Sequence, residues 1–181
     1  MARPDTKGLI LEAAGRIVLA RGAAGLTLEA VAEEAGLSKG GLLYHYGSKE
    51  ALLAAMVERL VAVTEERIEV HRQRDVAPGA WTRAYLASCA TDGLPESDPV
   101  GRLAVAVLAA GAIDPGLLGT LRARQETWRR RLSEDGIDPD IATIVRLSAD
   151  GLWLNDIFRI PVLTEDERRD VLARLEALTT P

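Results

Sequence analysis

The chain has 181 residues, enough for one ordinary domain or two small ones, and its 48% hydrophobic and 27% charged residues are a globular balance. Its single cysteine, Cys89, excludes an internal disulfide and a metal site built from several cysteines. The formal net charge is -5, which differs from the basic balance typical of proteins that bind nucleic acid.

The first predicted helix begins at Asp5 or Thr6, either of which can cap it, and ends at about Arg21, before Gly22. Apolar residues recur along it at helical spacing: Ile10, Ala13, Ala14, Ile17 and Val18. Because this spacing places them on one face of the helix, we expect the stripe to be buried.

Two short helices joined by a tight turn are predicted next, over residues 27–35 and 39–46. Thr27 and Ser38 can each accept a hydrogen bond from an unpaired backbone amide in the first turn of the helix that follows. Gly36 lies between the helices and suits the left-handed conformation that ends a helix. This order of caps, short helices and glycine turn is typical of a helix-turn-helix, whose second helix enters the DNA major groove.

The early residues of the second helix are the ones that meet base edges in such a motif. In this sequence they are Lys39, Gly40 and Gly41. The ammonium group of Lys39 can donate to guanine O6 or N7, or to a phosphate. The two glycines carry no side chain, so they allow the backbone to approach closely but recognise little by themselves.

The rest of the chain is also predicted to be helical. Helices are expected over residues 48–74, 80–92, 100–112, 117–134, 139–159 and 164–178, and a polar loop over residues 93–99. Thr164 and Glu167 have the spacing of a capping box at the start of the last helix. The sequence therefore predicts an all-α fold with about nine helices. No apolar run is long enough for a membrane span and the N-terminus lacks a secretory apolar core, so we expect a cytoplasmic protein.

Three consecutive segments near the N-terminus resemble the DNA-binding domain of TetR-family transcriptional regulators. The segments are ILEAAGRIVLARG (residues 10–22), LTLEAVAEEAGLSKGGLLYHY (residues 26–46) and GSKEALL (residues 47–53). The resemblance implies a helix-turn-helix DNA-binding domain over residues 1–50, which includes the three N-terminal helices. It also implies a C-terminal helical ligand-binding and dimerisation domain over residues 51–181, with the helix over residues 48–74 as the link.

The resemblance also implies which side chains contact DNA. Thr27, Tyr44, His45 and Lys49 match positions that contact phosphate in the family. With the residues of the motif itself, the predicted DNA-binding set is Thr27, Ser38, Lys39, Gly40, Gly41, Leu43, Tyr44, His45 and Lys49. His45 has an alternative role as a hydrogen-bonded structural histidine.

Two positions depart from the family pattern. Leu43 stands where related proteins often have tyrosine, so it can contact a thymine methyl group or belong to the core. Glu29 stands where they often have arginine. Lysine and arginine balance aspartate and glutamate in residues 1–50, so we expect local phosphate contacts, clear salt dependence and modest non-specific affinity.

In TetR-like proteins a small molecule usually binds among the middle helices. The candidate lining residues here are Trp81, Tyr85, Cys89, Leu103, Val107, Trp128, Leu147, Trp153 and Asn155. An apolar pocket with a few polar groups is the usual form of such a site, so a small apolar effector is expected. The alternative is that each aromatic side chain simply belongs to the core.

The last two helices of TetR-like proteins usually form a four-helix bundle with the same pair from a second subunit. Apolar positions that fit such a homodimer are Ile141, Val145, Leu152, Phe158, Val171, Leu172, Leu175 and Leu178. The alternative is that these faces pack against the core of their own chain.

We therefore expect a ligand-responsive transcriptional repressor that binds a palindromic double-stranded DNA operator as a homodimer and is released by its effector. The sequence has no Gly-rich phosphate loop, GxSxG elbow or HExxH motif, so no enzymatic activity is expected. His71 and Cys89 lack the spacing of metal ligands, and no metal or other cofactor is expected. The alternative function is a helical ligand-binding or scaffold protein with a weakened or non-functional DNA-reading head.

Overall fold

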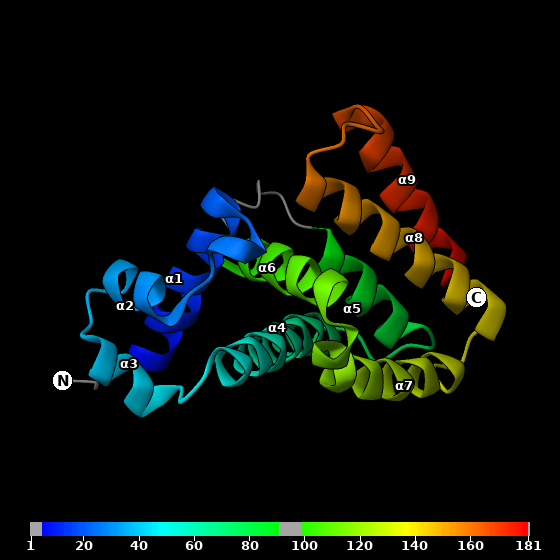
Figure 1. The fold of residues 1–181 in the computed structure, drawn as a ribbon. Helices are drawn as coiled ribbons and strands as arrows, with labels where there is room; N and C mark the ends of the chain where they lie inside the picture. The colour runs from blue at the N-terminus through cyan, green and yellow to red at the C-terminus, as the bar shows by residue number, and fades with distance from the viewer. Residues whose placement is uncertain (1–4, 91–98, 181) are drawn as a thin grey trace. The chain divides into compact units, whose positions relative to one another are not determined.

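The computed structural model describes residues 5–90 and 99–180, whose regular secondary structure is helical, with no strand among them (Figure 1). The α-helices are α1 (Thr6–Arg21), α2 (Leu28–Glu34), α3 (Lys39–His45), α4 (Lys49–Arg72), α5 (Ala80–Cys89), α6 (Pro99–Ile113), α7 (Gly119–Ser133), α8 (Pro139–Phe158) and α9 (Glu165–Leu178). Two short 3-10 helices are η1 (Ala23–Gly25) and η2 (Pro115–Leu118). The predicted all-α class is confirmed. None of the described helices has the length and apolar character needed to span a membrane.

The chain forms two compact units. Unit 1 comprises residues 1–61 and 95–122, and unit 2 comprises residues 62–94 and 123–181. Two of the three boundaries fall within α4 and α7, so each of these helices contributes residues to both units. Unit 1 contains the helix-turn-helix, and it also includes α6, which is distant in the sequence.

Unit 1 is built around α1, which packs against α2 and α6, while α2 packs against α3. The five residues of the predicted α1 stripe are all buried, as expected. Val31 of α2 and Leu42 of α3 are fully buried, and Tyr46 is buried at the end of α3. These side chains form the small apolar core that fixes the helix-turn-helix.

Side-chain caps set the beginnings of the first four helices. The Asp5 carboxylate accepts a hydrogen bond from the Gly8 amide, which resolves the choice between Asp5 and Thr6. Thr27 Oγ1 accepts from the Ala30 amide, Ser38 Oγ from the Gly41 amide and Ser48 Oγ from the Ala51 amide, each at 3.1 Å. Gly36 has φ +68°, the left-handed conformation predicted for it.

Unit 2 packs α5 against α8 and α9, and α9 also contacts α8. Three aromatic side chains contact one another in its core. The ring centroids of Trp81 and Tyr85 are 5.5 Å apart, and Tyr85 meets Trp128 edge to face at 5.8 Å. The predicted capping box is present, because Thr164 Oγ1 accepts from the Glu167 amide and the Glu167 side chain accepts from the Thr164 amide.

The N-terminus of α5 is capped by a residue distant in the sequence. One Asp135 carboxylate oxygen accepts from the Trp81 amide at 2.9 Å. The other accepts from the Thr82 amide at 2.8 Å and from the Thr82 hydroxyl at 2.6 Å. Arg83, in the same turn, donates to the Thr179 carbonyl at 2.8 Å, which ties the end of α9 to α5. Unit 2 is therefore held by polar contacts as well as by its core.

Several predicted helix ends shift by one to a few residues in the structure. The helix predicted over residues 48–74 is α4 and ends at Arg72, and the one predicted over residues 117–134 is split into η2 and α7. Pro115 begins η2, where its fixed φ suits the first turn. Residues 91–98 lie outside the described part of the chain, and with them the end predicted for α5 and nearly all of the loop predicted over residues 93–99.

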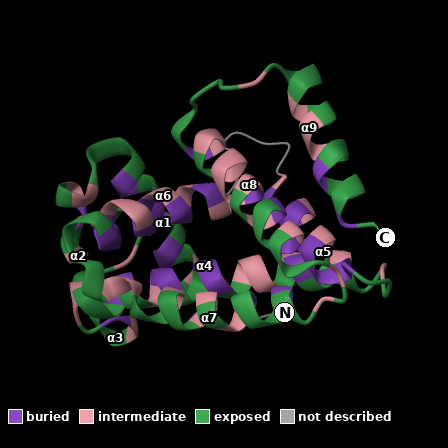
Figure 2. Cartoon of the chain, turned by 90° about the vertical axis from the view of Figure 1, so that its right-hand side faces the viewer, coloured by how far each residue is buried: buried purple, intermediate pink, exposed green. Residues whose placement is uncertain are grey.

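The apolar face predicted for dimerisation is largely the core of unit 2. Six of the eight predicted positions are buried in that core or packed against it: Ile141, Val145, Leu152, Val171, Leu172 and Leu175. Phe158 and Leu178 are exposed. The exposed apolar side chains of α8 are Ile144, Leu147, Leu154 and Phe158, whose spacing of three, seven and four residues places them on one stripe. Figure 2 shows α9 mostly exposed along its length.

Candidate nucleic-acid interface

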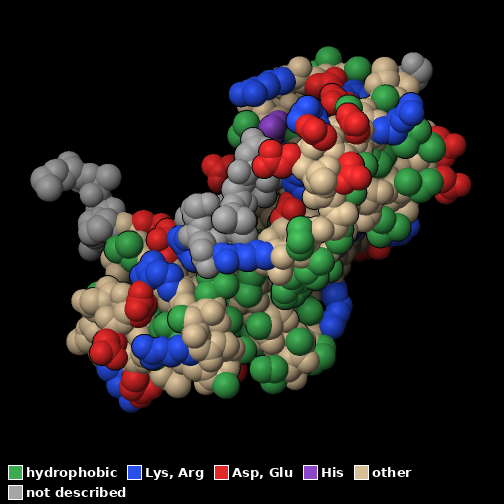
Figure 3. Space-filling view, turned by 90° about the horizontal axis from the view of Figure 1, so that it is seen from above, with side chains coloured by type: hydrophobic (Ala, Val, Ile, Leu, Met, Phe, Trp, Pro, Cys, Tyr) green, Lys and Arg blue, Asp and Glu red, His purple; other side chains and the backbone are tan. Residues whose placement is uncertain are grey.

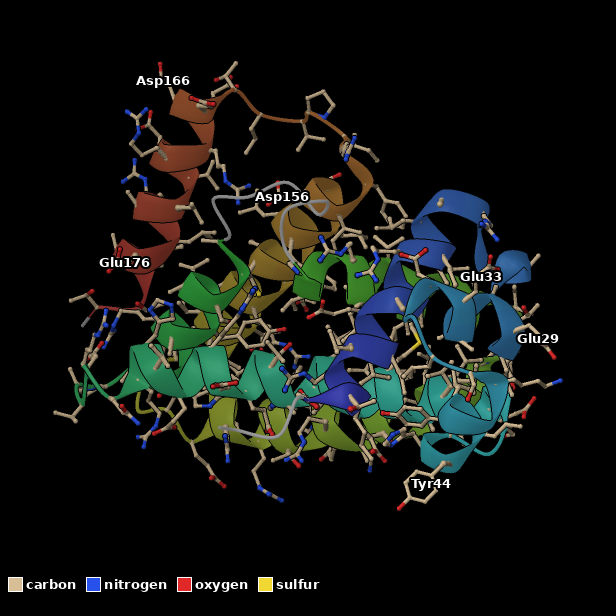
Figure 4. All side chains as sticks on the ribbon, turned by 90° about the vertical axis from the view of Figure 1, so that its left-hand side faces the viewer. Glu29, Glu33, Tyr44, Asp156, Asp166 and Glu176 are labelled. Atoms are coloured by element: carbon tan, nitrogen blue, oxygen red, sulfur yellow. The ribbon has the colours of Figure 1, made fainter. Side chains whose placement is uncertain are left out.

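Helix α3 carries the side chains that the sequence assigned to the major groove. Its first residue is Lys39, whose side chain is exposed, and Gly40 is exposed beside it. Tyr44 is 86% exposed, and its ring projects away from α3 (Figure 4). The hydroxyl and the ring edge of Tyr44 therefore lie outside the core and are accessible to another molecule.

The residues after Tyr44 continue this surface. The ring of His45 meets the ring of Tyr44 edge to face, with centroids 5.2 Å apart, so the two aromatic side chains support each other's orientation. Lys49, the first residue of α4, is half-buried. One short helix and the start of the next thus place a hydroxyl, an imidazole and an ammonium group close together along the chain.

Gly40 leaves open space at the surface of α3. A Cβ atom built there would meet no heavy atom within 4 Å, whereas one at Gly41 would lie 3.3 Å from Ser38 Oγ. Gly40 therefore costs helix stability without relieving any crowding inside the chain. The close approach of the backbone to another molecule at this point stays a prediction.

Thr27 and Ser38 use their hydroxyl groups as caps, and both residues are exposed. Leu43 is 38% exposed, which places it at the edge of the surface and not in the core, although Leu42 beside it is 0% exposed. Of the two roles predicted for Leu43, its exposure favours a contact with a thymine methyl group over a place in the core.

Charge at this surface is mixed. Lys39 Nζ lies 2.5 Å from Glu29 Oε1 on α2, and Arg16 Nε lies 2.6 Å from Glu34 Oε1. On the upper face of the molecule, which Figure 3 shows, side chains of both signs are also interspersed. The sequence singled out Glu29 as a departure from the family pattern but did not place it against Lys39, because the two residues are joined only by the fold of the turn between α2 and α3.

The ligand candidates are divided between the two units. Leu103 and Val107 are buried in α6 of unit 1. In unit 2 the buried core contains Trp81, Tyr85, Cys89 and Trp128, with Trp153 packed against it. Leu147 is 64% exposed on the apolar stripe of α8, so the expectation that it lines an apolar interior is corrected. The amide group of Asn155 donates to the Gly151 carbonyl in its own helix.

Two charged residues that the sequence analysis did not single out meet the core at Tyr85. The Tyr85 hydroxyl donates to Asp150 Oδ1 at 2.5 Å, and the Arg146 guanidinium lies 5.6 Å from the centroid of the Tyr85 ring. Burial raises the pKa of the Tyr85 hydroxyl and that of the Asp150 carboxyl. The spacing of four residues between Arg146 and Asp150 on a predicted helix was the available signal.

Cavities in the described part of unit 2 involve two of the ligand candidates. Trp81 is among the residues that line an open surface cavity of about 640 Å³ between the end of α4, the start of α5 and the end of α7. Asn155 lines a smaller cavity of about 100 Å³ beneath the segment that joins α8 to α9. The first has a volume compatible with a small molecule.

We expect Cys89 to be unreactive in the folded protein. Burial, with a further contribution from the charge of Asp150, raises the pKa of the Cys89 thiol to about 12. At pH 8 iodoacetamide should therefore alkylate the native protein on the order of 1,000-fold more slowly than the protein unfolded in urea, because the thiolate is the nucleophile. Alkylation rates of the native and unfolded protein within tenfold of each other, measured by mass spectrometry, would contradict the burial of the Cys89 thiol.

Two family models match the chain. The model described as bacterial regulatory proteins of the tetR family matches residues 10–56, and the model described as the tetracyclin repressor-like C-terminal domain matches residues 79–180. The first match contains α2, α3 and the beginning of α4, and the second contains α5 to α9. No curated protein is a significant match.

Solved structures with a similar fold cover nearly the whole chain. A transcriptional regulator from Rhodococcus sp. Rha1 has a TM-score of 0.73 at 22% identity, covering 96% of this chain and 95% of its own. The ketosteroid transcriptional regulator KstR2 of Mycobacterium tuberculosis has a TM-score of 0.65 at 16% identity, covering 99% and 98%. AibR, solved with isovaleryl coenzyme A and operator DNA, has a TM-score of 0.64 at 19% identity, covering 98% and 100%.

At these identities the solved structures establish the fold, and the family models carry the assignment. The C-terminal model alone matches more than half of the chain, and the N-terminal model includes the helix-turn-helix. The chain belongs to the TetR family of bacterial transcriptional regulators.

Proposed function

We propose that this regulator is a ligand-responsive repressor that binds a palindromic operator as a homodimer and is released by a small apolar effector. The observation that carries the proposal is the capped helix α3, which presents Lys39, Gly40 and Tyr44 on one exposed surface. A helix held in this way can enter a major groove with its early residues against base edges.

The proposed contacts divide into two kinds. Thr27, Tyr44, His45 and Lys49 contact phosphates, and they fix the position of the motif on the duplex. Ser38 caps α3 and supports the others. Lys39 donates to a base edge, with Gly40 and Gly41 allowing the backbone to approach and Leu43 touching a thymine methyl group.

The test of this function begins with a selection of bound duplexes from a random pool, followed by a salt titration of the selected duplex. An enriched inverted repeat and an affinity that falls steeply with salt are expected. Absence of enrichment and of binding at low salt would instead favour the helical ligand-binding or scaffold alternative, unless an effector is needed as a co-repressor.

Single substitutions should separate the two kinds of contact. Lys49→Ala and His45→Ala should weaken binding to all duplexes alike, and Lys49→Ala should lower the salt slope by about one per subunit. Lys39→Ala should also relax the preference at one base pair of each half-site. Titrations on the selected duplex and on a scrambled duplex measure both effects, and equal salt-insensitive affinities for the three variants would disprove this assignment.

We propose that the dimer forms through the last two helices, with the exposed stripe of α8 at its centre. Ile144, Leu147, Leu154 and Phe158 form this stripe at a spacing that suits packing against another helix. Dimerisation would also explain specificity, because two copies of α3 related by a two-fold axis recognise two half-sites of a palindrome.

Charged substitutions on this stripe should produce monomers. Leu147→Glu and Phe158→Glu each place a carboxylate in the proposed apolar contact, so sedimentation velocity at micromolar concentration should show half the mass of the wild-type protein. Leu9→Glu, which changes an exposed leucine on α1, is the matched control and should remain a dimer. A dimeric Leu147→Glu variant would place the interface elsewhere.

The proposed effector site lies in the helices of unit 2, around the aromatic cluster of Trp81, Tyr85 and Trp128. Aromatic faces supply apolar contact area, and the Asp150 carboxylate bound to the Tyr85 hydroxyl supplies a polar group. Helix α4 contributes residues to both units, so we propose that it transmits the effect of ligand binding to the helix-turn-helix. Fluorescence anisotropy of the selected duplex, measured as apolar compounds are added, tests whether ligand binding releases DNA.

A further inference from the structure

An ion pair joins the two helices of the helix-turn-helix at the start of α3. Lys39 Nζ lies 2.5 Å from Glu29 Oε1, with 60% of the Lys39 side chain and 63% of the Glu29 side chain exposed. Lys39 is the first residue of α3, and Glu29 lies in the first turn of α2. Figure 4 shows Glu29 projecting outward from α2. The pair therefore lies on the exposed surface that carries the proposed base-reading residue.

The pair changes what Lys39 can do. A free lysine ammonium is a mobile point charge on a flexible stem, and it binds any nearby phosphate. A carboxylate at 2.5 Å restricts that motion and offsets the charge. The hydrogen bond from Lys39 is the main reason why the pKa of the Glu29 carboxyl lies below its usual value, so the pair is charged at neutral pH and is lost only as the pH falls through that lowered pKa.

We propose that Glu29 is a positioning residue for DNA specificity, which holds the Lys39 ammonium for a base edge and reduces its attraction to phosphates. The inference rests on the proposed function, since it assigns Lys39 a role in DNA binding. Non-specific binding comes from phosphate contacts, while specific binding adds base contacts. Removal of the Glu29 charge should therefore strengthen non-specific binding more than specific binding.

Glu33 supplies a matched control. It is exposed one helical turn beyond Glu29 on α2, and both project from the same edge of the motif (Figure 4). Glu33→Gln removes the same charge as Glu29→Gln, but it leaves the pair between Glu29 and Lys39 intact. A difference between these two variants therefore measures the pair and not the general charge of the domain.

The experiment compares full-length wild type, Glu29→Gln, Glu33→Gln, Lys39→Gln and the double variant Glu29→Gln/Lys39→Gln. Each is titrated over a range of KCl concentrations with the duplex selected by the wild type and with a scrambled duplex. Glu29→Gln should tighten binding to the scrambled duplex by about fivefold and steepen its salt slope by about 0.9 per subunit. Binding to the selected duplex should change by less than about twofold, so selectivity falls.

The controls should separate the mechanism from a simple charge effect. Glu33→Gln should change both affinities alike, by about twofold or less. In the Lys39→Gln background, Glu29→Gln should have no more effect than Glu33→Gln has in the wild type, because the group it positions is gone. The inference is overturned if Glu29→Gln and Glu33→Gln behave alike, if selectivity is retained, or if the effect of Glu29→Gln persists without Lys39.

A second selection distinguishes positioning from direct recognition by Glu29. Duplexes selected by Glu29→Gln should relax at the same base pair as those selected by Lys39→Gln. Relaxation at a different base pair would overturn the inference, because it would mean that Glu29 itself accepts from a base such as cytosine.

Two outcomes separate this inference from the proposed function. A wild-type protein that binds no duplex at low salt, with or without candidate effectors, defeats both. A wild-type protein that selects an inverted repeat, with variants that fail the comparison above, defeats only the role of Glu29. Titration of the Glu29 carboxyl by NMR without DNA tests the pair directly: Lys39→Gln should raise its midpoint, and an unchanged midpoint would overturn the inference.

Discussion

Replacing Leu42 with alanine should destabilise the helix-turn-helix by about 3 kcal/mol, because it removes a fully buried side chain and leaves a cavity between the helices of the motif. For a chain of this length, that loss corresponds to a decrease of about 10 °C in the midpoint of thermal unfolding. Circular dichroism during urea and thermal unfolding measures the change, and hydrogen exchange of the α3 amides locates it.

The neighbouring leucine is the control for this prediction. Leu43 is 38% exposed, whereas Leu42 is 0% exposed, so Leu43→Ala removes the same atoms from the edge of the motif instead of its core. Its effect on stability should be below about 1 kcal/mol. If Leu43 contacts a thymine methyl group, Leu43→Ala should instead weaken binding to the selected duplex. Equal destabilisation by both variants would contradict the burial pattern of α3.

Replacing Asp135 with alanine should destabilise unit 2 by about 3 kcal/mol, because its carboxylate accepts three hydrogen bonds at the N-terminus of α5. Thr82 is fully buried, so the amide and hydroxyl that lose their acceptor cannot be solvated without movement of α5. The three tryptophans, Trp81, Trp128 and Trp153, all belong to unit 2, so tryptophan fluorescence during urea unfolding reports this loss.

Asp135→Asn tests whether the loss of stability depends on the number of acceptor oxygens at the N-terminus of α5. The amide side chain retains one carbonyl oxygen of the two carboxylate oxygens and loses the charge that favours a helix N-terminus. It should therefore lose about half as much stability as Asp135→Ala. An unfolding midpoint equal to that of the wild type in both variants would show that the cap at Trp81 and Thr82 contributes little.

The helix-turn-helix could be recognised from the sequence because its determinants are local. The hydroxyl groups of Thr27 and Ser38 cap amides three residues ahead, and Gly36 takes the left-handed conformation that ends α2. The apolar spacing in α1 likewise predicted its buried stripe. Interactions of this range depend on residues only a few positions apart, so they are present in the sequence pattern itself.

The buried and exposed faces of α8 were assigned less well, because they depend on contacts with distant segments. The sequence left two alternatives for the apolar positions of α8, a dimer contact or the core of their own chain, and it did not show which of them the core of unit 2 covers. Val145 and Leu152 pack in or against that core, while Leu147 and Phe158 lie on the exposed stripe. A helical pattern gives the angle between side chains about the axis, and only the packing of neighbouring helices decides which angle faces inward.

The sequence by itself determined the all-α class, the capped helix-turn-helix and the surface residues of α3, because each depends on contacts within one or two helical turns. Tertiary structure alone decided that α6 packs on α1, that Asp135 caps α5 and that Glu29 pairs with Lys39. These contacts join segments whose sequence separation carries no periodic signal. They form because burying apolar helix faces brings particular polar side chains within hydrogen-bonding distance, and that outcome depends on the arrangement of several helices at once.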